Sequence, residues 1–314
     1  MFMAVLLLPY SLFSQYSFKE LDSIIDRCSL DSSCFYLNKQ KKVASTIDER
    51  FRSHVNFSQY YRSVNEYEQA LLCLDSSSAF IHTKENKGVY FQNKGLIKHF
   101  QVEYLNAVEY FEKSLVYFEK GGKRAAAYHS LSNTYKKLRQ YDSVCVYLNK
   151  AKKSFNQEDN PIGYGVVLFD IAGYHFDKGQ YDSSYVYYMQ SLKIYESEND
   201  KIRESKTYSL LSNVFWAQKD YREAIRAAQK SDSISQMMSY KEGHLVSILT
   251  IAKIYVDMQE YDSATYYLQP LLVELGEENK YLAIKQHVVS ALANIYVNRG
   301  EVDLALKYQE KALL

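Results

Sequence analysis

One pattern recurs along the chain and constrains its fold more than any other feature. In its clearest copy, Leu131–Tyr135 is followed by Tyr141, Tyr147 and Ala151. The same order of large, small and aromatic residues returns about 40 residues later and then in three further copies, and two looser copies lie upstream. Self-similarity at a nearly fixed period predicts a repeat architecture in which each unit packs against its neighbours. The seven copies are marked by Glu66–Ala70, Glu103–Ala107, Tyr141, Tyr181, Tyr221, Tyr261 and Gly300–Val302.

Small residues recur at two places in each copy and predict pairs of closely packed helices. The chain is 47% hydrophobic and has only three prolines and eleven glycines, a composition that favours helices. A small side chain on each of two helices lets their backbones approach closely, and tyrosines can fill the space around them. The small residues of the first helix are Ser132, Ala172, Ser212, Ala252 and Ala293, and those of the second are Ser184, Ala224, Ala264 and Ala305.

This pattern resembles the tetratricopeptide repeat family, whose signature is a large residue, Leu, a small residue, Tyr, then Gly-x-Tyr, Ala, an aromatic and Ala. The resemblance covers roughly residues 50–314. The period here is 37 to 41 residues, which is longer than the family norm of about 34. The lengthened units resemble those of long-period bacterial arrays found in sensory and regulatory proteins. The resemblance implies an all-α, right-handed superhelical solenoid whose inner surface is lined mainly by the first helix of each pair.

The domain organisation predicted from these copies has three parts. Residues 1–14 are a possible signal peptide, 15–49 form N-terminal capping helices, and 50–314 hold seven repeats. The repeats run over about 50–86, 87–123, 124–163, 164–203, 204–243, 244–284 and 285–314.

The first residues bear on localisation. Met1–Phe13 is too short to span a bilayer but fits the apolar part of a secretory signal, with Ser14 before a possible cleavage site. The basic residues of such a signal are missing, so an apolar first helix of a cytoplasmic protein is the alternative. Export to the periplasm is the favoured interpretation, and it would allow a disulfide between Cys28 and Cys34.

The last repeat ends without the polar capping helix that usually closes such an array. The chain stops inside the predicted second helix, at Leu314. We therefore expect either that the chain is a fragment or that an effector domain follows.

The candidate binding residues lie on the first helices. Positions three before, one after and four after each small residue are expected to face inward. The recurrent asparagines could hold the backbone of an extended peptide, or could be merely solvated. Two phenylalanines and the single tryptophan could anchor a partner, or could serve packing. The candidates are His129, Asn133, Lys136, Phe169, Phe176, Asn213, Trp216, Lys253 and Asn294.

The net charge and the lack of catalytic motifs exclude several classes of function. The 38 basic and 37 acidic residues nearly cancel, which disfavours direct binding to nucleic acid. No transmembrane helix, catalytic motif, metal-ligand cluster or cofactor-binding loop is found in the sequence. We therefore expect a non-catalytic scaffold that binds a protein or peptide, as the sensory part of a bacterial regulator. The alternatives are a stand-alone receptor for a short peptide or small ligand, and an enzyme with an unrecognised site.

Overall fold

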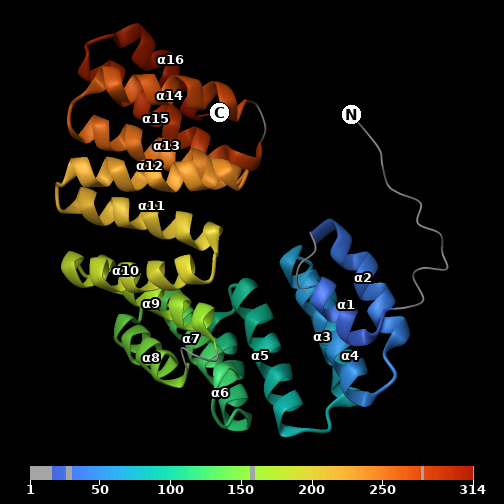
Figure 1. Cartoon of the computed structure of the whole chain (residues 1–314). Coiled ribbons are helices and arrows are strands. Elements are labelled where there is room, and N and C mark those ends of the chain that lie inside the picture. The colour runs from blue at the N-terminus through green and yellow to red at the C-terminus, as the bar shows by residue number, and fades with distance from the viewer. Residues whose placement is uncertain (1–15, 26–29, 156–159, 277–278, 314) are drawn as a thin grey trace. The chain divides into compact units, whose positions relative to one another are not determined.

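The computed structural model describes residues 16–25, 30–155, 160–276 and 279–313. These residues form sixteen α-helices and no strand (Figure 1). The chain divides into two compact units, residues 1–154 and 155–314, each of which is described by itself. The predicted signal peptide and Cys28 lie outside the described residues, so the cleavage and disulfide stay predictions.

Unit 1 begins with a helix pair that lacks the repeat pattern. A polar network attaches this pair to the first repeat: Gln40 and Asn56 both donate to Asp22 Oδ1, each at 2.8 Å. Three repeats follow in the unit. Its helices are α1 (Phe18–Ile25), α2 (Leu30–Val43), α3 (Ile47–Ser63), α4 (Tyr67–Ser77), α5 (Lys84–Phe100), α6 (Tyr104–Tyr117), α7 (Gly122–Lys137) and α8 (Tyr141–Ser154).

Unit 2 holds four repeats, whose helices run alternately in opposite directions (Figure 1). Here and in unit 1, each first helix begins two or three residues before the repeat boundary that the sequence predicts. The helices are α9 (Pro161–Asp177), α10 (Tyr181–Ser197), α11 (Lys201–Ala217), α12 (Tyr221–Met237), α13 (Lys241–Asp257), α14 (Tyr261–Leu275), α15 (Leu282–Asn298) and α16 (Val302–Leu313).

The turn inside each helix pair has one fixed geometry. Its middle residue adopts a positive φ, as at Gly179 (71°), Lys219 (64°) and even the β-branched Val102 (67°). The next N–H bonds back to the last turn of the preceding helix, for example Asp220 N–H to the Phe215 carbonyl at 2.9 Å. This arrangement satisfies a helix-terminal carbonyl. The second helix then starts at once, and in six of the seven pairs its first residue is a tyrosine.

Small residues lie between the helices of each pair, as the pattern predicts. Ser132, Ala172, Ser212 and Ala252 are at most 1% exposed. At Gly95 a methyl group would come within 2.7 Å of the Phe111 ring, so the helices approach too closely for a larger side chain.

Aromatic rings fill the remaining space in a repeated way. A ring from the first helix stacks on a ring from the second in the pairs Tyr135–Tyr147, Tyr255–Tyr267 and Tyr296–Tyr308, at centroid distances of 5.3, 5.8 and 5.4 Å. Such stacked pairs stabilise a core beyond their buried area. Much of the tyrosine content therefore serves packing.

Candidate functional site

We call the surface formed by the first helices of the pairs the A-helix face. In unit 2 it is formed by α9, α11, α13 and α15, and α13 contacts both α11 and α15. Six of the predicted binding residues lie on these helices. They are Phe169 and Phe176 on α9, Asn213 and Trp216 on α11, Lys253 on α13 and Asn294 on α15.

The two phenylalanines are partly committed to packing. Phe169 meets Tyr188 edge-on at 5.3 Å, and Phe176 lies tilted against Tyr181 at 5.6 Å. Both rings are only partly buried. Each ring therefore packs on one side and keeps an accessible side, and its role in binding a partner stays a prediction.

Trp216 is held by a carboxylate of the next repeat. Its Nε1 donates to Asp257 Oδ2 at 3.0 Å, and Lys219 Nζ and Tyr221 OH donate to the same oxygen at 2.9 Å. The hydrogen bonds from Lys219, Trp216 and Tyr221 lower the pKa of Asp257 to about 2. The indole N–H is thus already bonded within the chain, and only the ring is available to a partner.

The polar candidates of unit 2 differ in exposure. Asn213 and Lys253 are partly buried, whereas Asn294 is exposed. Burial lowers the pKa of the Lys253 ammonium group. The three side chains therefore lie at unequal depths, and their contact with a partner stays a prediction.

A hollow of about 210 Å³ opens among α9, α11 and α13. Apolar atoms come from Phe169, Leu210 and Val246, and Lys206 and Glu242 bring opposite charges to it. Of these lining residues, Phe169 and Ser209 stand at inward positions expected from the sequence, and only Phe169 is among the predicted binding residues. The other lining residues fall outside those positions. The remaining lining residues are Ser205, Ser209, Ser231, Tyr240 and Gly243.

Four serine hydroxyls are joined beside this hollow. Ser205 Oγ lies 3.1 Å from Ser231 Oγ and 2.7 Å from Ser235 Oγ, and Ser247 Oγ donates to Ser231 Oγ at 2.9 Å. All four residues are at most 1% exposed. Since their hydroxyls bond to one another, this cluster connects α11, α12 and α13 without leaving polar atoms to be satisfied by a partner.

In unit 1 the three remaining candidates lie on α7. Asn133 Nδ2 and His129 Nε2 are 3.4 Å apart, and Lys136 is exposed one turn further on. Neighbouring first helices are linked by polar side chains: Gln92 Nε2 donates to Ser130 Oγ at 3.0 Å, and His99 Nδ1 lies 2.9 Å from Thr134 Oγ1. Polar side chains therefore predominate on the A-helix face of unit 1.

Gln59, Arg62, Gln92 and His99 occupy inward positions in the first two repeats, which the sequence reading did not examine. The signal was present, because Ser58 and Gly95 stand at the small position of α3 and α5. It was weak because neither helix carries the full Leu-small-x-x-aromatic pattern.

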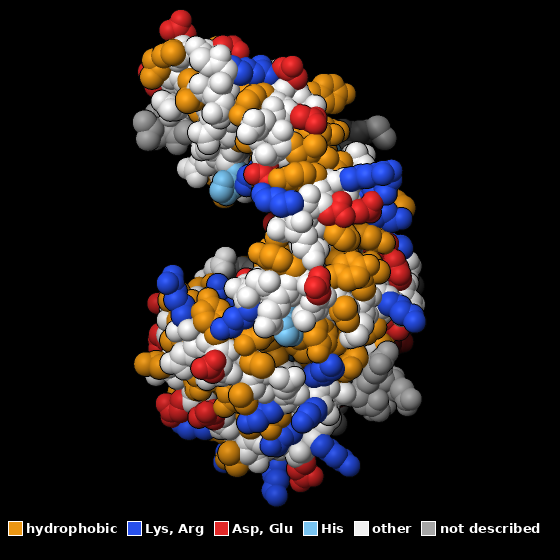
Figure 2. Space-filling view, turned by 90° about the vertical axis from the view of Figure 1, so that its left-hand side faces the viewer, with side chains coloured by type: hydrophobic (Ala, Val, Ile, Leu, Met, Phe, Trp, Pro, Cys, Tyr) orange, Lys and Arg blue, Asp and Glu red, His pale blue; other side chains and the backbone are white. Residues whose placement is uncertain are grey.

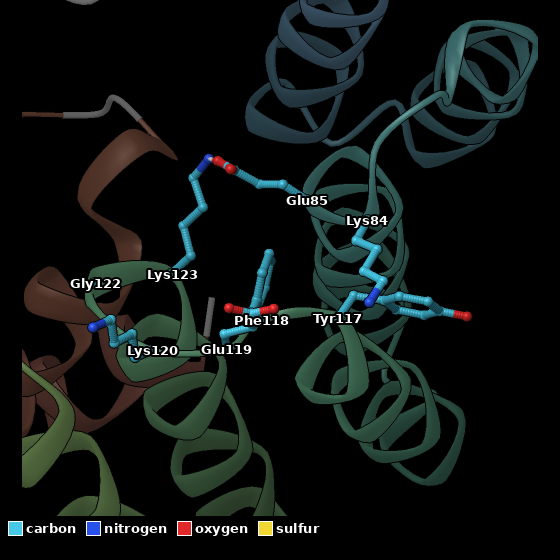
Figure 3. Close-up of a pocket in the computed structure, with 8 residues that line it drawn as sticks. All are labelled: Lys84, Glu85, Tyr117, Phe118, Glu119, Lys120, Gly122 and Lys123. Atoms are coloured by element: carbon cyan, nitrogen blue, oxygen red, sulfur yellow. Dashed lines mark hydrogen bonds and ion pairs between the residues drawn. The ribbon is translucent and has the colours of Figure 1, made fainter.

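A second hollow, of about 440 Å³, lies between the first turns of α5 and α7. Figure 3 shows the Lys123 side chain reaching from α7 to Glu85 on α5, with the Phe118 ring standing between these helices. A methyl group at Gly88 would come within 2.5 Å of the Phe118 ring. The ion pair and this close packing fit a role in joining the two repeats.

The surface chemistry is mixed. Figure 2 shows acidic and basic side chains interspersed over the face that it draws. Within the described ranges, no group of three or more His, Cys, Asp or Glu side chains could hold a metal ion. In the same ranges, no helix is both long enough and apolar enough to cross a membrane.

Comparison with known proteins identifies the repeats. Residues 165–236 and 125–157 each match a family model described as tetratricopeptide repeat. Response regulator aspartate phosphatase E of Bacillus subtilis (strain 168) is 28% identical over 176 residues, which are 54% of this chain and 45% of that protein. The match thus spans less than half of the relative's length.

Solved structures share the architecture. The apo form of RapI superimposes with a TM-score of 0.65 at 15% identity, covering 96% of both chains. NprR in complex with its cognate peptide NprX gives a TM-score of 0.58 at 16% identity, covering 94% of this chain and 87% of that one. The chain is therefore an all-α array of tetratricopeptide repeats, which confirms the fold predicted from the sequence.

Proposed function

We propose that this chain is a non-catalytic regulatory scaffold that binds a peptide segment of a partner on the A-helix face of unit 2. One apolar side chain of that segment would occupy the hollow among α9, α11 and α13. The observation that carries the proposal is this hollow, where apolar walls adjoin a lysine and a glutamate.

The size of the hollow favours a peptide over a whole small molecule. Its volume of about 210 Å³ is below the roughly 300–1,000 Å³ typical of small-molecule pockets. A single large side chain fits such a space, and Lys206 and Glu242 can bond to the polar backbone on either side of it. A stand-alone small-ligand receptor is therefore the weaker alternative.

Three neighbouring features can extend this contact. The Trp216 ring, the Asn213 carboxamide and Lys253 lie on the same helices as the hollow. Aromatic anchors surrounded by adaptable polar groups are typical of peptide-binding surfaces. The similarity to NprR, whose structure contains its cognate peptide, supports the same mode of binding.

A regulatory role rests on the same comparisons, since the relative from Bacillus subtilis is named for a response regulator. We propose that the chain acts by binding, either alone or as the sensory part of a protein with an effector beyond Leu314. A hydrolytic activity on a phosphorylated response regulator, which that relative's name suggests, would contradict the non-catalytic proposal.

A blocking substitution tests the site. Ser209 is partly buried at the hollow, so Ser209→Trp should fill it without disturbing the helix core. Wild type and variant would be probed with an array of random hexapeptides, and the best binders measured by calorimetry. We expect at least a tenfold loss of affinity in Ser209→Trp, about 1.4 kcal/mol.

The matched control is Gln190→Trp on α10, where the residue is exposed and lines a different hollow. It should bind like the wild type. Equal affinities of the wild type and Ser209→Trp, with unchanged melting temperatures, would overturn the proposed site.

A further inference from the structure

Arg62 is a cation on the A-helix face of unit 1. It lies in the last turn of α3, four residues after the small residue Ser58, at the position that Lys136 holds on α7. Its Nη1 atom is out of contact with solvent and has no hydrogen-bond partner among the described residues. Within the same residues, no carboxylate forms an ion pair with it.

The surroundings of this guanidinium do not compensate its charge. The guanidinium lies over the face of the Phe100 ring, with Cζ 5.8 Å from the ring centroid. Burial lowers the pKa of Arg62, and no neighbouring charge opposes that effect. An arginine stays protonated even so, and a buried charge without a partner is costly to the free energy of folding.

A polar acceptor in the same region is also unsatisfied. Gln101, which follows Phe100 at the end of α5, has a buried Oε1 that accepts no hydrogen bond from the part of the chain that the structure describes. Two unsatisfied groups at the ends of adjacent helices are unusual, since most buried polar atoms are bonded. They indicate a place prepared for a polar ligand.

The other inward positions on the A-helix face of unit 1 also bring no negative charge near Arg62. None of the inward positions of α3, α5 and α7 is acidic. Burial, and secondarily Lys137, lowers the pKa of His99, which therefore tends to be neutral. The positions are Val55, Gln59, Arg62, Gln92, Leu96, His99, His129, Asn133 and Lys136.

We infer that the A-helix face of unit 1 binds a carboxylate of a peptide, with Arg62 as its ion-pair partner. The planar guanidinium can hold a carboxylate through two parallel hydrogen bonds. The carboxylate can come from an Asp or Glu side chain or from the free C-terminus of the peptide. This inference rests on the proposed function for the class of ligand, a peptide segment of a partner, and adds a separate site in unit 1 with the chemical group that it selects.

A purely structural role is the competing explanation. The carbonyl groups at the end of α3 favour a nearby cation, and the Phe100 ring adds a cation–π contact. In that case Arg62 would stabilise the fold without selecting acidic peptides. The two explanations differ in what happens when the charge of the peptide is removed.

The test is a double-mutant cycle. Hexapeptides selected by the Ser209→Trp variant, whose unit 2 hollow is filled, would be remade with Asn or Gln in place of Asp or Glu, and separately with a C-terminal amide. Affinities of each pair would be measured for the wild type, Arg62→Gln, Arg62→Lys and the control Arg50→Gln. Arg50 is an exposed arginine in the first turn of the same helix.

We expect removal of the interacting carboxylate to weaken binding to the wild type and to Arg50→Gln by at least about tenfold. The same change should have less than about a twofold effect on Arg62→Gln, and an intermediate effect on Arg62→Lys. Loss on amidation identifies the C-terminus as the source, and loss on Glu→Gln or Asp→Asn identifies a side chain.

Two results would overturn the inference. Equal losses in the wild type and Arg62→Gln would show that the carboxylate binds elsewhere, and peptides selected without any acidic group would show that none is recognised. If no hexapeptide bound any variant, the proposed function would fail together with the inference. If hexapeptides bound the wild type and none bound Ser209→Trp, only the inference would fail.

Discussion

At the scale of single residues, buried hydroxyls show how unevenly this core satisfies its polar atoms. Ser184 and Ser212 stand at the small positions of two repeats, and both buried hydroxyls lack a hydrogen-bond partner among the residues that the structure describes. Ser205, in contrast, bonds to Ser231 and Ser235. Serine is therefore used in one place only for its size and in another for its hydrogen bonds.

This difference predicts opposite effects of the same substitution. Ser212→Ala should raise the free energy of unfolding by about 1 kcal/mol, because it removes an unsatisfied hydroxyl and keeps the close packing. Ser205→Ala should lower it by about 1–2 kcal/mol, because hydroxyls of the cluster lose a partner. Urea unfolding followed by circular dichroism measures both, and a destabilised Ser212→Ala would contradict the interpretation.

At the scale of helices, the best-defined link between two repeats is Asp257. Its carboxylate at the end of α13 receives hydrogen bonds from residues at the end of α11 and the start of α12. It therefore ties a whole helix pair to the next one. Because the side chain is about a third exposed (36%), solvent screening keeps the contribution below about 1 kcal/mol.

The pH dependence of this link follows from its pKa. A carboxylate whose pKa falls from 3.8 to about 2 on folding stabilises the folded chain above pH 3.8, and this contribution is lost as the pH falls toward 2. The stability difference between the wild type and Asp257→Asn should therefore be constant from pH 7 to 5 and shrink below about pH 4.

Urea unfolding at a series of pH values measures this difference, and tryptophan fluorescence reports the local change because Trp216 is the only tryptophan. Asp142→Asn, an exposed position on α8, is the control. A difference that grows as the pH falls would show that the carboxylate is not stabilised by these hydrogen bonds.

At the scale of the whole molecule, stability should be distributed along the chain. Each unit has its own buried clusters, represented by Leu74 in unit 1 and Leu268 in unit 2, both 0% exposed. In a repeat array each repeat packs mainly against its neighbours, so damage should stay local.

The matched substitutions Leu74→Ala and Leu268→Ala test this. Each should cost about 2–5 kcal/mol locally. Amide hydrogen exchange should become faster in α3–α5 for the first variant and in α13–α15 for the second. Uniformly faster exchange over the whole chain in both variants would instead indicate a single cooperative unit.

The sequence predicts most of this architecture because its signals are local. Tyr141, Tyr181, Tyr221 and Tyr261 mark the second helices, and each is the first residue of one. Small residues at a fixed distance identify the packed face, since only they permit the close approach. The class of fold and the order of helix pairs follow from these two periodicities.

The candidate site was less accessible to prediction because it depends on contacts that are distant in the sequence. Trp216 meets Asp257 from 41 residues away, and the equivalent position of the neighbouring repeats varies, being Lys137, Asp177, Ala217 or Asn298. Likewise, whether Arg62 has a partner depends on which groups the tertiary fold brings next to it. Periodicity could place these side chains on a face but could not determine what they bond to.

The regularity of helix length in unit 2 has a consequence for how such a chain can change over generations. Helices α9 to α13 each have 17 residues, and the turns between them each have three. The stretch Lys201–Tyr240 can therefore be duplicated or lost by recombination in register, and each new junction would still join one complete repeat to another. The array can thus gain or lose binding surface in whole steps, while its individual faces diverge to suit new partners.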